Sequence, residues 1–319
     1  MLSKETKIYV AGHRGMVGSA IFRLLVKNGY RNVIGLESSE LDLRNQQDVN
    51  VFFNENQPEV VIDAAARVGG ILANSKYPYQ FLMENLQIQN NLIDFSLKCG
   101  VKKFIFLGSS CIYPKMSQQP IKEEYLLNGF LEPTNEAYAI SKIAGVKACE
   151  AVKKQYGLDY ISLMPTNLYG PYDNFDLQSS HVLPAMIRKF HEAKEKKNIT
   201  VELWGSGNPM REFLHVDDLA EAVIFSMENE LKESLYNVGT GTDISIKELA
   251  KLIQQITGHK GDIKWDTTKP DGTPRKLLDI SKLKNEGWES RIDLESGILS
   301  TFNWFIDNLK DIKEVKLNF

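Results

Sequence analysis

The chain has 319 residues, of which 43% are hydrophobic and 25% charged, and its formal net charge is −3. This length predicts about two domains of roughly 150 residues each, and the near-neutral charge argues against a surface that neutralises a nucleic-acid backbone. No apolar run approaches the roughly 18 residues of a membrane span, and the N-terminus lacks a signal-peptide pattern. Three scattered cysteines are too few for a disulfide framework or a metal site. We therefore expect a cytoplasmic protein that binds no metal, nucleic acid or membrane.

Short β-rich apolar runs alternate with longer amphipathic stretches through the first half of the chain. This alternation predicts an α/β fold built on a doubly wound parallel sheet, the Rossmann arrangement. A different α/β layout of the same elements stays open as an alternative. Strands are expected at 7–11, 32–36, 60–66, 103–108 and 160–163, and helices at 16–28, 46–54, 79–99 and 138–156.

The rhythm changes after about residue 172. Because the stretch 217–241 reads like the sheet and helix material of the first half, we expect a discontinuous domain boundary. Residues 1–175 plus about 215–242 are assigned to the Rossmann domain, and about 176–214 plus 243–319 to a second, smaller α/β domain. Further helices are expected at 181–197, 217–227 and 246–257, and strands at 201–205 and 235–238.

Three glycines follow the first expected strand with the spacing G-x-x-G-x-x-G and open the first expected helix. Glycine permits the tight turn and the close approach of backbone N–H groups to a phosphate at the positive end of a helix. Glycines also serve as plain turns and helix caps, so the motif alone is weak. Its position between a strand and a helix favours a dinucleotide site. The residues assigned to this site are Gly12, His13, Arg14, Gly15, Met16, Val17 and Gly18.

The choice of dinucleotide depends on the end of the second strand. An acidic residue there holds the ribose 2′-hydroxyl of NAD, whereas arginine favours the 2′-phosphate of NADP. Glu37 stands at this position and favours NAD, while Arg14 in the glycine turn can reach a 2′-phosphate. The alternative for Glu37 is an exposed carboxylate without a ligand.

Tyr138 and Lys142 are spaced i and i+4, which places them on one face of an expected helix. A phenol with a pKa of about 10 exchanges protons poorly at pH 7 unless a neighbouring cation stabilises its anion. Alone, the pair is explained as simply by a surface tyrosine and a solvated lysine. Ser109 and Ser110 follow a strand at the expected carboxyl edge of the sheet, where a hydroxyl can bind a carbonyl that Tyr138 protonates. We therefore predict hydride transfer at a carbinol or ketone carbon.

With a serine, a tyrosine and a lysine that follow such a glycine turn, the chain resembles members of the short-chain dehydrogenase/reductase superfamily. Its length and its expected second domain are similar to those of the extended branch of this superfamily. Longer motifs narrow the resemblance to the GDP-L-fucose synthase family over almost the whole chain. These motifs are Gly108–Pro114 (GSSCIYP), Met164–Pro171 (MPTNLYGP), Asp173–Phe175 followed by His181, Arg211–Asp218 (REFLHVDD) and Lys269–Lys276 (KPDGTPRK).

The resemblance implies that GDP-4-keto-6-deoxy-D-mannose is epimerised at C3 and C5 through an enolate and then reduced at C4. Ser109 and Tyr138 would hydrogen bond the enolate oxygen. Cys111 and His181 would form the acid–base pair that moves the C3 and C5 protons. A free thiol titrates near about 8.5, so Cys111 acts as a base only if its pKa is lowered. A buried apolar cysteine and a helix-start histidine without chemistry are the simpler alternatives.

The same resemblance implies the remaining contacts of cofactor and substrate. The expected cofactor is NADPH, and NADH stays open because this chain has Glu37-Ser38-Ser39 where family members often carry arginine. A solvated Lys189 and a core Trp204 are the alternatives to substrate binding. Leu107, Gly108, Ser109, Ser110, Pro165, Thr166, Asn167, Leu168 and His181 would line the nicotinamide side with Lys142 at its ribose, and Lys189, Trp204, Arg211 and Asp271 would hold the GDP-sugar.

Two other classes of function stay open. One is another extended-branch nucleotide-sugar epimerase or reductase, although a dehydratase would carry an acidic pair where Cys111 stands and a 4-epimerase would retain its NAD without consuming it. The other is an NADP(H)-binding redox sensor or scaffold, a class that commonly loses the tyrosine or the lysine. The extended branch commonly dimerises through a helix bundle, so a homodimer is expected. We expect His215 to be structural, near the start of the helix at 217–227.

Overall fold

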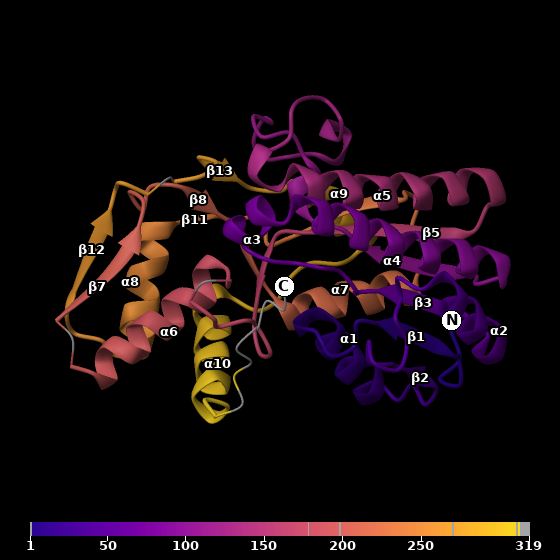
Figure 1. The fold of residues 1–319 in the computed structure, drawn as a ribbon, viewed down its shortest axis with the longest axis horizontal. Coiled ribbons are helices and arrows are strands. Elements are labelled where there is room, and N and C mark those ends of the chain that lie inside the picture. Colours follow the sequence, from indigo (N-terminus) through magenta and orange to yellow (C-terminus); the bar gives the residue numbers. More distant parts are fainter. Residues whose placement is uncertain (1, 178, 198, 270, 311, 313–319) are drawn as a thin grey trace.

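A six-stranded sheet forms the centre of the larger part of the molecule in the computed structural model, which describes residues 2–177, 179–197, 199–269, 271–310 and 312 (Figure 1). Its order is β10-β5-β4-β3-β1-β2, and every neighbouring pair is parallel. The doubly wound parallel sheet is thereby confirmed, and its strand order reverses between β1 and β3, where open α/β sheets bind ligands. The strands are β1 (Ile8–Ala11), β2 (Val33–Ile34), β3 (Val60–Asp63), β4 (Lys103–Leu107), β5 (Asp159–Pro165) and β10 (Leu235–Val238).

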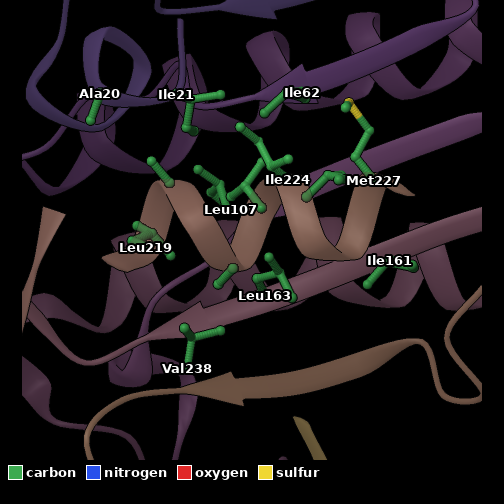
Figure 2. Close-up of a cluster of buried hydrophobic side chains, with 14 of the residues drawn as sticks. Ala20, Ile21, Ile62, Leu107, Ile161, Leu163, Leu219, Ile224, Met227 and Val238 are labelled. Carbon is green, nitrogen blue, oxygen red and sulfur yellow. The ribbon is translucent and has the colours of Figure 1, made fainter. Parts of the chain in front are cut away.

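Helices cover both faces of the sheet because its strands are apolar on both sides. Figure 2 shows one face, where Leu219, Ile224 and Met227 of α7 lie against the sheet together with Ile21 of α1. Three other helices bury the opposite face. The helices are α1 (Met16–Lys27) and α7 (Val216–Glu228) on the first face, and α2 (Gln46–Asn56), α4 (Pro78–Lys98) and α5 (Glu136–Tyr156) on the second.

Local sequence explains where these helices begin and end. The Asn45 side chain caps α2 by accepting hydrogen bonds from the backbone N–H groups of Gln47 and Asp48 at 3.0 and 3.4 Å. Helix α5 stops at Gly157, whose φ of 69° suits the left-handed end of a helix. His215 caps α7 by accepting the Asp217 N–H at 3.2 Å, which confirms its structural role. The helices observed here lie within a few residues of those expected.

A second hydrophobic core lies beyond the sheet, around α6 (Val182–Glu195), α8 (Ile246–Thr257) and α10 (Leu294–Asp307). The parallel strands β7 (Thr200–Trp204) and β12 (Asp262–Asp266) close it on one side. Figure 1 shows this part beside the carboxyl ends of the parallel strands, with α7 remaining in the larger part. Strand β10 also belongs to the larger part, as an edge strand of the six-stranded sheet. The proposed domain boundaries stay a prediction.

Short strands that the sequence did not reveal lie between the two cores. Strands of two or three residues are too brief for an alternating hydrophobic pattern to show. Strand β6 (Asn167–Tyr169) pairs with β9 (Phe213–His215), and β8 (Met210–Arg211) lies between β11 (Ile244–Ser245) and β13 (Arg275–Lys276). The remaining elements are α3 (Ile71–Lys76), α9 (Ser281–Glu286) and the 3₁₀ turns η1 (Ser110–Ile112), η2 (Glu123–Tyr125) and η3 (Pro133–Asn135). None of the described helices is long and apolar enough to cross a membrane.

Candidate active site

The glycine turn joins β1 to α1 at the point where the strand order reverses. Gly12 has a φ of 75°, and a Cβ there would lie 2.7 Å from the backbone oxygen of Ala64. A Cβ on Gly18 would collide with the backbone of Gly12. These two glycines are therefore required by the turn itself and by the close packing of helix on strand.

Gly15 is different, because the protein does not need it for packing. A Cβ there would meet only the Gly12 oxygen, at 3.4 Å, which is an ordinary contact. Gly15 is also the N-cap of α1, and no side chain caps this helix end. The first turn of α1, beginning with Met16 and Val17, thus presents backbone N–H groups at an open, positive helix end. This arrangement fits the pyrophosphate of a dinucleotide.

The other residues of the turn lie beside the end of β2. The Arg14 guanidinium forms an ion pair with the Glu37 carboxylate. The His13 ring packs against Phe22, with ring centroids 5.8 Å apart, and a Cβ on Gly35 would collide with it. The ring of His13 is therefore packed between α1 and the end of β2.

Ser109 and Lys142 lie at the carboxyl end of β4. Ser109 follows the strand and its hydroxyl accepts a hydrogen bond from the Cys111 N–H at 3.4 Å. Lys142 of α5 donates to the Leu107 carbonyl at 2.8 Å, and its Nζ lies 4.6 Å from the centroid of the Phe106 ring. These contacts bring α5 directly against the strand end. The alternative of a solvated lysine is excluded, because Lys142 is 3% exposed.

Electrostatic interactions join Cys111 to this group. Burial raises the pKa of the Tyr138 phenol, and the neighbouring Cys111 raises it further. Burial also raises the pKa of Cys111, while the positive charges of Lys276 and Lys142 and the Ser109 hydrogen bond pull it down. The net pKa of the thiol is raised, so the sulfur carries its proton at neutral pH, and the lowered pKa that a base requires is not observed.

Lys276 is a residue of the site that sequence reasoning missed. It lies on β13, and its charge is the largest influence that lowers the pKa of the Cys111 thiol. Burial lowers the pKa of Lys276 itself. The residue stood inside a recognised motif, but nothing local indicated that the chain returns here to the end of β4.

His181 forms the N-cap position of α6, apart from the cluster at β4. Its side chain is exposed to solvent, and the protein around the ring lowers the pKa by disfavouring the charged form. Within the described residues, no hydrogen bond or charge interaction links His181 to Cys111. The pairing of His181 with Cys111 therefore stays a prediction.

The end of β5 is held by a buried glutamate that sequence reasoning also missed. The Glu212 backbone oxygen accepts the Asn167 side-chain N–H at 2.7 Å and the Thr166 hydroxyl at 3.3 Å. Its carboxylate accepts backbone N–H groups of Thr240, Gly241 and Leu278 at 2.7 to 3.0 Å. Glu212 therefore ties the Pro165–Leu168 segment to two distant stretches of chain.

Three of the four expected substrate residues lie close together beyond this segment. Asp271 accepts the Ser206 N–H and hydroxyl at 2.6 and 2.7 Å, and its charge interacts with Arg211. Trp204 is 56% exposed, so a core role is excluded, and Lys269 lies 5.5 Å from its ring centroid. A cation, an aromatic face and a carboxylate are therefore brought into one region, and their binding of a substrate stays a prediction.

Lys189 approaches the same region from α6. Its ammonium donates to the backbone oxygen of Glu202 at 3.1 Å, on the strand that ends at Trp204. Burial lowers its pKa. The alternative of a freely solvated Lys189 is therefore excluded.

Comparison with known proteins agrees with this geometry. Residues 8–239 match the model of the NAD dependent epimerase/dehydratase family. The chain is 54% identical to "Probable GDP-L-fucose synthase 1" of rice, across 98% of this chain and 96% of that one. It is 50% identical to the GDP-L-fucose synthase of Escherichia coli, across 96% and 98%. The structure of a GDP-L-fucose synthetase from Naegleria fowleri bound to NADP superposes with a TM-score of 0.90 at 29% identity, covering 98% and 96% of the two chains. The chain therefore belongs to the NAD dependent epimerase/dehydratase family and, within it, to the GDP-L-fucose synthases.

Proposed function

We propose that this enzyme converts GDP-4-keto-6-deoxy-D-mannose to GDP-L-fucose, by epimerisation at C3 and C5 followed by NADPH-dependent reduction at C4. The observation that carries the proposal is the position of Cys111 in one electrostatic cluster with Tyr138 and Lys142 at the end of β4. A reductase alone needs the tyrosine and the lysine, whereas epimerisation needs an additional group that exchanges protons with carbon.

The reduction relies on Ser109, Tyr138 and Lys142. NADPH, held at the glycine turn and along Leu107–Ser110 and Pro165–Leu168, supplies the hydride to C4. Ser109 orients the sugar ketone by hydrogen bonding its oxygen, and Tyr138 donates the proton that completes the hydroxyl. Lys142 stabilises the resulting phenolate and binds the nicotinamide ribose.

The epimerisation uses Cys111 and His181. Removal of the proton at C3 or C5 gives an enolate, because the C4 ketone accepts the electron pair, and return of a proton to the other face inverts the carbon. Ser109 and Tyr138 hydrogen bond the enolate oxygen. Cys111 and His181 carry protons to and from the two faces, and Lys276 stabilises negative charge on the sulfur.

The GDP-sugar is held by the cluster formed by Trp204, Arg211 and Asp271, with Lys189 beside it. Arginine and lysine neutralise the diphosphate, and Trp204 offers its exposed face to the guanine.

We further propose that the enzyme works in the cytoplasm as a homodimer. Tyr79 of α4 and Ile140 and Tyr156 of α5 are exposed on two neighbouring helices and supply apolar surface for a helix bundle. Sedimentation equilibrium tests this part, since a mass of one chain contradicts it.

The first experiment measures NADPH oxidation with GDP-4-keto-6-deoxy-D-mannose and identifies the product by chromatography. The expected product is GDP-L-fucose. A product reduced at C4 without epimerisation would instead identify a plain 4-reductase and remove Cys111 and His181 from the mechanism. No oxidation of NADPH or NADH would leave the cofactor-retaining epimerase and the redox sensor, and the absorption spectrum of the purified protein would separate these two.

A further inference from the structure

Asp63 is a buried carboxyl group close to the site for which the mechanism above has no role. It is the last residue of β3 and is 0% exposed. One carboxylate oxygen accepts the Ala65 N–H at 3.1 Å, and the other has no hydrogen-bond partner among the described residues. An ionised carboxylate left in this state is costly unless a positive charge is near.

The register of the sheet identifies that charge. Asp63 is paired with Phe106 on the adjacent strand β4. Successive residues of a strand face opposite sides of a sheet, and Val61 and Phe106 both belong to the core on the α4 and α5 side. Asp63, two residues after Val61, faces the same side, where the Lys142 ammonium lies 4.6 Å from the Phe106 ring centroid.

A nearby negative charge would stabilise the buried ammonium of Lys142. Its ammonium is buried and donates to the neutral Leu107 carbonyl. No carboxylate among the described residues, Asp63 included, lies within the 4.0 Å of a direct ion pair, so the pairing with Asp63 is an interaction of charges over a longer distance. Burial lowers the pKa of Lys142, and the charge of Asp63 is the largest influence that raises it. The effect is mutual: burial raises the pKa of Asp63 to about 6, and the charge of Lys142 is the largest influence that lowers it, so that Asp63 is mostly ionised above pH 6.

The other described ionisable groups whose pKa the charge of Asp63 affects are uncharged at neutral pH. Tyr9 faces it from β1, and Tyr138 and Cys149 face it from α5. Burial raises the pKa of each of these groups, that of Cys149 to about 12. Lys142 is thus the one cation among the described groups that interact with Asp63.

We infer that Asp63 is a positioning residue whose carboxylate keeps the Lys142 ammonium charged, and that Tyr138 depends on this charge to exchange its proton with the sugar oxygen. The inference rests on the proposed function for its consequence in catalysis. The pairing of Asp63 with Lys142 stands apart from it and can be measured without the sugar.

The first test is the pH profile of C4 reduction by Asp63→Asn, which keeps the shape and the bond to Ala65 but removes the charge. The basic limb, where Lys142 loses its proton, should move down by about one pH unit, and kcat on that limb should fall about tenfold. Asp218→Asn is the matched control, because Asp218 of α7 is a buried carboxylate that accepts the backbone N–H groups of Arg291 and Ile292 and is not among the groups that act on Lys142. Its basic limb should stay in place, and an unmoved limb in Asp63→Asn would overturn the inference.

The second test needs no turnover. In the wild-type background Asp63→Asn leaves the Lys142 charge without a partner, so Tm should fall. In the Lys142→Met background the same change removes an unpaired carboxylate, so Tm should rise. The comparison of Lys142→Met with the Lys142→Met/Asp63→Asn double variant can still be made if Asp63→Asn alone does not fold. Equal losses of Tm in both backgrounds would mean a role in packing only and would overturn the pairing. If the wild-type enzyme were inactive on the sugar but Asp63→Asn still lowered Tm in the wild-type background and raised it in the Lys142→Met background, the proposed function would be rejected and the pairing of Asp63 with Lys142 would stand.

Discussion

The Arg14 guanidinium is joined to the Glu37 carboxylate in an ion pair that spans the glycine turn and the end of β2. Both side chains are partly exposed, 58% for Arg14 and 45% for Glu37. The two residues that favour different dinucleotides therefore lie together and oppose each other. A 2′-phosphate bound to Arg14 has to compete with the Glu37 carboxylate and is repelled by it, whereas a ribose 2′-hydroxyl can donate to Glu37.

Removal of the Glu37 charge should accordingly sharpen the preference for NADPH. We expect Glu37→Gln to raise the ratio of kcat/KM for NADPH to that for NADH by about fivefold, equivalent to about 1 kcal/mol for an exposed charge. Glu55→Gln is the control, because Glu55 is an exposed carboxylate on α2 away from the turn. A ratio that changes equally in both variants would mean that general surface charge, and not Glu37, sets the preference.

Tyr138→Phe should separate the two stages of the reaction. Without the phenolic proton, C4 reduction should slow by about 10²- to 10⁴-fold, while exchange at C3 and C5 continues in part because Ser109 still binds the enolate oxygen. The measurement pairs NADPH oxidation with deuterium uptake from D₂O by mass spectrometry. Tyr160→Phe serves as control, since Tyr160 stacks on Phe104 at 5.2 Å outside the site. Full reduction by Tyr138→Phe would remove Tyr138 as the proton donor.

Cys111→Ser should produce the opposite separation. Serine is a far weaker acid than cysteine, so deuterium uptake at carbon should fall by about 10²-fold or more. The matched change is Cys149→Ser, at a fully buried cysteine on α5 that the mechanism does not use. Wild-type deuterium uptake by Cys111→Ser would show that another group moves the protons.

Lys276→Met should make the Cys111 thiol harder to ionise. Since the charge of Lys276 lowers the pKa of Cys111, its loss should move the pH at which iodoacetamide alkylates Cys111 upward by about one unit. The assay uses a Cys99→Ser/Cys149→Ser background, so that Cys111 is the single thiol. Lys251→Met on α8 provides the control. An unchanged alkylation profile would mean that Lys276 does not act on the sulfur.

Asp173 should make the enzyme less stable as the pH rises. Burial raises the pKa of this carboxyl to about 7 from 3.8, and one of its oxygens has no hydrogen-bond partner among the described residues. The folded state thus binds the proton more tightly than the unfolded state, and this stabilising contribution is lost as pH rises through about 7. Asp173→Asn should therefore have a higher Tm than wild type at pH 8.5, with a smaller difference at pH 5.5.

Asp42→Asn is the control of opposite sign for Asp173. The Arg44 side chain holds the pKa of Asp42 below its usual range, so the ionised form of Asp42 favours the folded state. Its replacement should lower Tm slightly at neutral pH and above. Parallel Tm curves for Asp173→Asn and wild type between pH 5.5 and 8.5 would contradict the assignment.

Most of the larger elements were predictable because their signals are local. One contiguous stretch contains the strand Ile8–Ala11, the glycine turn and the helix Met16–Lys27. Apolar periodicity indicates the strand and the helix, and the glycines that the turn requires indicate the turn. The Tyr138 and Lys142 pair was equally visible, since i and i+4 spacing on a helix is a property of adjacent sequence. Long motifs then allowed the family to be recognised.

Tertiary structure alone decided which distant groups meet. Lys276 acts on Cys111, Asp63 faces Lys142, and Glu212 ties Asn167 to Leu278, yet none of these pairs is close in sequence. Strand register and burial determine such contacts, because the sheet places the ends of separate strands side by side and removes water from between their side chains. The residue types that perform the chemistry could thus be read from the sequence, whereas their protonation states depend on neighbours that only the folded chain brings together.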